Sequence, residues 1–142
     1  MTGDRDPRVT GPGDQGTAPT GFAALEQEFD VSSLYALRAA VAAHAAKAGL
    51  SRQQVYDVTA AAHELAANAV LHGAGRGRVR LWTSGQFLYC QVTDDGHGGV
   101  GTAWPTAHGH GLWLVGQVAS QLSIDHSPTG TTVTARFLLS PQ

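Results

Sequence analysis

The chain has 142 residues, of which 42% are hydrophobic and 14% are charged, and this composition fits one compact domain with a modest core. The formal net charge is −2 and lysine and arginine form no block, so no nucleic-acid-binding face and no polybasic membrane patch is indicated. The apolar runs are shorter than the roughly 20 residues of a membrane helix, and the chain does not begin with a basic, then apolar, leader. We expect a soluble, cytoplasmic protein that binds neither nucleic acid nor membrane.

The N-terminal segment differs from the rest of the chain. Residues 1–20 are rich in Gly, Pro, Thr and Asp, with too few apolar side chains to offset the entropy of ordering, so they predict a disordered tail. Residues 21–142 are then expected to form the domain. Its first element is a strand ending near Asp30, because alternation puts Leu25 and Phe29 on one face.

Two helices are expected next. The first follows from apolar residues at helical spacing and ends at Gly49; these residues are Leu34, Leu37, Val41, Ala45 and Ala48. The second covers about 52–72, because Ser51 and Gln54 form a capping box before a new apolar stripe and Gly73 ends it. The stripe consists of Val55, Val58, Ala62, Leu65 and Ala69.

The remaining elements are short. Residues 78–83 and 87–93 alternate around Ser84-Gly85 and predict a hairpin. Residues 112–122 predict a short helix, and 123–126 and 132–139 a second hairpin with its turn at 127–130. This order predicts an α+β fold: a two-layer sandwich with helices on one face of a mixed, mostly antiparallel sheet. Alternation also predicts that Cys90 is a buried, inert thiol beside Leu88 and Val92.

Three segments carry candidate functional residues. On the second helix, Asp57, Glu64 and Asn68 form a polar stripe beside the apolar one, which is either one wall of a pocket or an ordinary solvated face. After the strand at 87–93, Asp94 precedes Gly96 and Gly98. Glycines allow close backbone approach to a ligand and a carboxylate can accept from an amine, although an Asp-Gly-rich hairpin turn explains the segment equally well.

The third segment places Gly109 and Gly111 just ahead of the short helix. The free N–H groups and the dipole of a helix N-terminus favour phosphate, so the junction is a phosphate site or simply a flexible connector.

Two other known motifs are matched only in part and are excluded. Gly96, Gly98 and Gly101 have the spacing of a dinucleotide fingerprint, but Trp104-Pro105 follows where a helix should begin. His63-Glu64 lacks the second histidine of a zinc hydrolase. The histidines, including His126 in an expected turn region, show no paired metal spacing.

Taken in order, the segments resemble the four motifs of the gyrase, heat-shock chaperone, histidine kinase and MutL (GHKL) ATP-binding superfamily, which has the Bergerat ATP-binding fold. The matching pieces are Glu64-x-x-x-Asn68, Asp94-x-Gly96-x-Gly98, Gly109-x-Gly111-Leu112 and Gly130-Thr131. Within the superfamily, residues 22–139 look most like the stand-alone anti-sigma factor serine/threonine kinases of bacteria.

The resemblance implies a role for each matching residue. Asn68 would ligate Mg²⁺ next to the ATP phosphates and Glu64 would be the general base. Asp94 would accept from the adenine amine, supported by Thr131. Gly96 and Gly98 would let the backbone approach the base, and residues from Gly109 through His110 and Gly111 to Leu112 would close over the phosphates.

The implied function is phosphorylation of a serine on an anti-sigma antagonist protein, with a sigma factor as a further partner and a possible homodimer. The segment 99–107 contains no Lys or Arg, although phosphoryl transfer relies on cations. An alternative is therefore a nucleotide-gated module that sequesters a sigma factor or another partner without phosphotransfer. A slow ATPase subunit of a larger complex is a third possibility.

Overall fold

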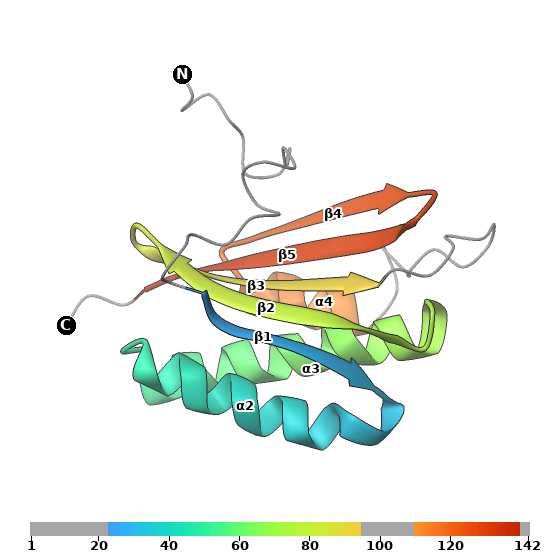
Figure 1. Ribbon diagram of the computed structural model, residues 1–142. Helices are drawn as coiled ribbons and strands as arrows, with labels where there is room; N and C mark the ends of the chain where they lie inside the picture. Colours follow the sequence, from blue (N-terminus) through green and yellow to red (C-terminus); the bar gives the residue numbers. More distant parts are fainter. Residues whose placement is uncertain (1–22, 95–109, 140–142) are drawn as a thin grey trace.

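The computed structural model describes residues 23–94 and 110–139, and within them one sheet is covered on one face by helices (Figure 1). The elements in chain order are β1 (Ala23–Asp30), the short 3-10 helix η2 (Val31–Ser33), α2 (Leu34–Lys47), α3 (Arg52–His72), β2 (Arg76–Ser84), β3 (Phe87–Asp94), α4 (His110–Val118), β4 (Gln121–Ser127) and β5 (Gly130–Leu138). The strand order is β1-β2-β3-β5-β4. The predicted two-layer α+β sandwich is confirmed, and every strand pairing in the described part is antiparallel.

Alternation along the strands places the core between the sheet and the helices. Val79 and Leu81 of β2 are fully buried, as are Cys90 and Val92 of β3. The prediction that Cys90 is buried is confirmed, and burial raises the pKa of its thiol to about 12 because the thiolate would lose its hydration.

The bounds of α3 agree with the prediction, but one of its cap contacts differs. The Ser51 hydroxyl accepts from the Gln54 backbone N–H at 3.1 Å, as a capping residue should. The Gln54 side-chain amide donates instead to the Leu138 carbonyl oxygen, at 2.6 Å. It therefore links the start of α3 to the end of β5.

Near the second hairpin the structure corrects the prediction. The helix α4 begins at His110 and ends at Val118, and Gln121 and Leu122 belong to β4, where they pair with Arg136 and Ala135 of β5. A local apolar pattern could not separate a helix from a strand there, because the pairing partners lie 13 and more positions further along the chain. His126, at the edge of the expected turn, lies within β4, which continues to Ser127.

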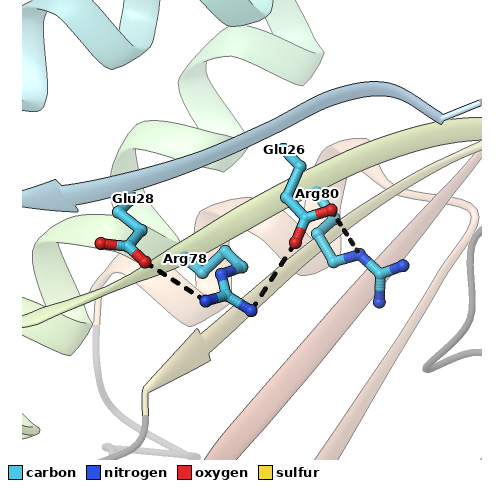
Figure 2. A network of polar contacts seen from close by, with 4 residues as sticks. All are labelled: Glu26, Glu28, Arg78 and Arg80. Carbon is cyan, nitrogen blue, oxygen red and sulfur yellow. Dashed lines mark hydrogen bonds and ion pairs between the residues drawn. The ribbon is translucent and has the colours of Figure 1, made fainter.

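The opposite face of the sheet is polar near β1 and β2. Figure 2 shows Arg78 between Glu28, at 3.2 Å, and Glu26, at 3.6 Å, with Arg80 4.0 Å from Glu26. A hollow of about 370 Å³ lies beside this network, and its lining includes Gln91. No helix in residues 23–94 and 110–139 has both the length and the apolar character needed to cross a membrane.

Candidate functional site

Four chain segments meet at one end of the sandwich. There α3 ends and β2 begins, and β2 pairs through Arg78 with Thr93, just before the end of β3. The β4–β5 turn lies at the same end, since Asp94 of β3 is the register partner of Thr131 of β5. Only two residues separate α4 from β4, so the chain reverses there and α4 begins on the side toward which β4 runs. The end of α3 and the β4–β5 turn lie at the right-hand side of Figure 1. This end carries the candidate site.

Asp94 closes β3 as a buried carboxylate. Only 3% of its surface is exposed, although the residue terminates a strand. One carboxylate oxygen, Oδ1, accepts from the Ala74 backbone N–H at 3.0 Å, just beyond the end of α3. A buried carboxylate needs such donors because it has lost its water. The contact holds the carboxylate between the end of the helix and the sheet.

Gly73 provides the space for that carboxylate. It ends α3 with φ −116°, which any residue can adopt, so its backbone does not require glycine. A Cβ built at position 73 would instead overlap the Asp94 carboxylate and lie 2.9 Å from the Ala69 carbonyl oxygen. The sequence predicted Gly73 as a helix stop, and the structure adds that its missing side chain makes room for Asp94.

Thr131 lies beside Asp94 in the sheet and is also buried. Its hydroxyl is 3.1 Å from Nδ1 of His126, its register partner on β4. The sequence assigned Thr131 to the site only through the family resemblance, and it assigned no role to His126. A cross-strand pairing, not a motif, brings these two side chains together.

Asn68 and Glu64 lie on α3, four residues apart and therefore about one turn apart along one side of the helix. Asn68 is buried, and its amide nitrogen has no hydrogen-bond partner among the described residues. Because the two ends of an Asn amide are assigned by their partners, this orphaned end can be the oxygen that a hard cation prefers. Glu64 is partly exposed, so a ligand can reach its carboxylate.

These observations test whether the residues suit a nucleotide with Mg²⁺. A buried polar atom without a partner costs free energy, and a bound ligand would relieve that cost. Asn68 supplies such an atom, Asp94 supplies a fixed acceptor, and Gly73 leaves the room that the Asp94 carboxylate occupies. The described part of the site therefore suits a ligand that carries both a hydrogen-bond donor and a cation.

The remaining predicted positions are described in part or not at all. Gly96, Gly98 and Gly109 lie outside the described residues. His110, Gly111 and Leu112 form the first turn of α4, so the helix begins earlier than the sequence indicated. The first N–H groups of such a nine-residue helix have no partners within the helix itself.

Comparison with known proteins places the chain in a family. The family described as "Histidine kinase-like ATPase domain" matches residues 28–137, which is most of the chain. The chain therefore belongs to the histidine kinase-like ATPase domain family, and membership implies ATP binding. The GHKL resemblance of the sequence is confirmed at this level. No match was found among curated proteins.

Among solved structures, the chain is similar to the crystal structure of the RsbU and RsbW domains of Rv1364c from Mycobacterium tuberculosis. The TM-score is 0.65 and the sequence identity is 23%, over 83% of this chain. At that identity the likeness shows a shared fold. The match covers 33% of the chain in that structure, so the present chain spans about a third of its length.

Proposed function

We propose that the chain is an anti-sigma factor-type serine/threonine protein kinase that binds ATP with Mg²⁺ and phosphorylates a serine on an antagonist protein. The observation that carries this proposal is the pair on α3: buried Asn68 with an unpartnered amide, and accessible Glu64 one turn earlier. The similarity to a structure that contains an RsbW domain supports the choice of kinase class.

Base recognition in this proposal depends on Asp94 and Thr131. The Asp94 carboxylate accepts from the adenine amine, with its orientation held by the Ala74 N–H. Thr131, its neighbour on β5, offers a hydroxyl to the base directly or through a water. A site built on such polar groups rejects bases that lack the matching donor, because its own groups would then be buried unpaired. Gly96 and Gly98 let the backbone approach the base.

Phosphate binding and catalysis involve the two helices. The N-terminus of α4, which begins at His110, would direct backbone N–H groups toward the phosphates, and Gly109 to Leu112 would close over them. The Asn68 amide oxygen would hold Mg²⁺, and this ion would supply positive charge to the phosphates. Glu64 accepts the proton of the attacking serine hydroxyl, a contribution that is typically about 10²–10⁴ in rate.

A second candidate is a nucleotide-gated binding module that sequesters a sigma factor or another partner without turnover. The absence of Lys and Arg from segment 99–107 favours it, because that segment supplies no cation to the transferred phosphoryl group. A homodimer and a sigma factor are partners in both candidates. A slow ATPase subunit of a larger complex would release phosphate with no protein acceptor.

Transfer of radiolabel from γ-labelled ATP to a purified anti-sigma antagonist protein separates these candidates. The kinase is expected to label the antagonist on serine, and Glu64→Ala should abolish labelling while ATP still binds. Glu28→Ala, an exposed carboxylate on the other face of the sheet, is the matched control and should label normally. Binding of Mg·ATP without any transfer from the wild-type chain would contradict the kinase and favour the binding module.

A further inference from the structure

Three polar side chains form a row across the sheet at the candidate site. Asp94 of β3 is the register partner of Thr131 of β5, and Thr131 is in turn the partner of His126 of β4. Aligned residues of antiparallel strands point to the same face, with Cβ atoms about 5 Å apart. Thr131 therefore lies between Asp94 and His126 in this row. No motif of the family resemblance includes His126.

The contact between His126 and Thr131 decides what the threonine hydroxyl can do next. Nδ1 of His126 lies 3.1 Å from the hydroxyl oxygen, and either group can be the donor. A hydroxyl has a single proton. If the threonine donates to the ring, the proton is used and the hydroxyl can then only accept. If the ring nitrogen donates, the proton is left for a further acceptor.

The neighbouring carboxylate indicates which arrangement suits a purine. Asp94 can only accept, so it matches the exocyclic amine of adenine. The ring nitrogen next to that amine, N1, is an acceptor and needs a donor. Guanine has the reverse order, a carbonyl oxygen followed by an N–H. A site selective for adenine therefore needs an acceptor at Asp94 and a donor at Thr131.

We propose that His126 is a positioning residue for base recognition: it donates from Nδ1 to the Thr131 hydroxyl and so directs the Thr131 proton toward N1 of the base. This inference rests on the proposed adenine site. His126 itself is exposed at the end of β4, whereas Thr131 is buried, so the histidine acts on the ligand through the threonine.

Calorimetric titration with ATP and with 1-deaza-ATP, in which a C–H replaces N1, tests the proposal. The wild-type chain should bind 1-deaza-ATP about fivefold more weakly than ATP, the scale of one hydrogen bond. His126→Ala should weaken ATP binding by a similar factor, because the threonine proton is no longer directed at N1. The affinity for 1-deaza-ATP, which has no N1, should hardly change.

Two further variants complete the design. In His126→Asn the amide nitrogen can take the place of Nδ1 as a donor, so discrimination between the two ligands should return. His44→Ala is the matched control: His44 lies on α2, and its Nδ1 is 2.9 Å from the Ala40 carbonyl oxygen of the same helix. It should behave as the wild type.

Several results would overturn the proposal. If His126→Ala weakens the binding of ATP and of 1-deaza-ATP equally, the histidine has a structural role alone. If the substitution changes neither affinity, the histidine has no role in binding. Wild-type protein that binds ATP but does not distinguish 1-deaza-ATP would also exclude a Thr131 donor. A wild-type chain that binds no ATP would refute the proposed function itself, and the inference with it.

Nitrogen NMR of the ligand-free protein is an independent readout. In mildly alkaline solution, where an ordinary imidazole is neutral, Nδ1 of His126 should give the resonance of a protonated nitrogen. A bare Nδ1 that accepts from Thr131 would contradict the proposal even if ATP binds.

Discussion

Gly73 shows how a single missing side chain can shape a site. The end of α3 passes so close to Asp94 that a Cβ at position 73 would overlap the carboxylate. Local sequence could predict a helix stop there, but it could not show the clash, since Asp94 comes from a strand that lies beyond β2 in the chain. The identity of this residue is therefore explained by tertiary contact.

Gly73→Ala is expected to lower the free energy of unfolding by about 1–3 kcal/mol, the cost of overpacking, and to weaken ATP binding by displacing Asp94. Urea denaturation and calorimetry measure the two effects. Gly116→Ala is the matched control, because a Cβ in that part of α4 meets no atom within 4 Å. It should be neutral or stabilise the chain by up to about 1 kcal/mol. Equal stability of the two variants would contradict the packing described at Asp94.

Burial of the Cys90 thiol predicts that the free energy of unfolding depends on pH. Burial raises the pKa of its thiol from 9.0 to about 12, so above pH 9 the unfolded chain loses this proton while the folded chain keeps it. The free energy of unfolding should therefore fall as the pH rises through this interval, by up to about 1.4 kcal/mol per unit from this group. Cys90→Ala should lack this component, and urea denaturation of both proteins between these pH values measures the difference. If the free energies of unfolding of the wild type and of Cys90→Ala change with pH in the same way, burial of the thiol is contradicted.

At the scale of elements, α3 was predicted with its observed bounds because its signals are local. Ser51 caps the first turn and Gly73 ends the last. The α4–β4 boundary was not predicted, because Gln121 and Leu122 become a strand through pairing with β5. The residues of the candidate site also fall into a group that the sequence indicates and a group that only the fold brings in. Its candidate residues were proposed from spacing and family resemblance, whereas Ala74 and His126 contact those residues only in the folded chain.

The cap of α3 can be tested by substitution. Ser51→Ala removes the acceptor for the Gln54 backbone N–H and should lower the free energy of unfolding by about 1 kcal/mol. Ser51→Asp keeps an acceptor at the same position and should preserve most of the stability. Urea denaturation of the three proteins measures both effects, and a Ser51→Ala variant as stable as the wild type would show that the cap contributes nothing.

At the scale of the whole molecule, the two faces of the sheet have different roles. The helix-covered face contains the apolar core and, at one end, the candidate nucleotide site. The other face carries the network of Arg78 with Glu26 and Glu28, whose side chains are half-exposed or more. Exposed ion pairs contribute little, with a median of about 0–1 kcal/mol, so the core supplies most of the stability.

The site also depends on the whole chain. Asn68, Gly73, Asp94 and Thr131 come from α3, from its end, from β3 and from β5, and they meet because the sheet places β3 beside β5. The family match spans the same elements, from residue 28 to residue 137. The central claim is that this end of the fold is an adenine nucleotide site organised around Asp94.

Calorimetric titration of Asp94→Asn with Mg·ATP, beside the wild type, tests this claim most directly. The Asn side-chain oxygen can still accept from the Ala74 N–H, so the fold should survive, but the amide then presents a donor where the carboxylate accepted. We predict that ATP binds the variant more than about tenfold more weakly, equivalent to roughly 1.4 kcal/mol. Saturable wild-type binding with unchanged affinity in the variant would contradict the claim and would place the adenine pocket elsewhere on the molecule.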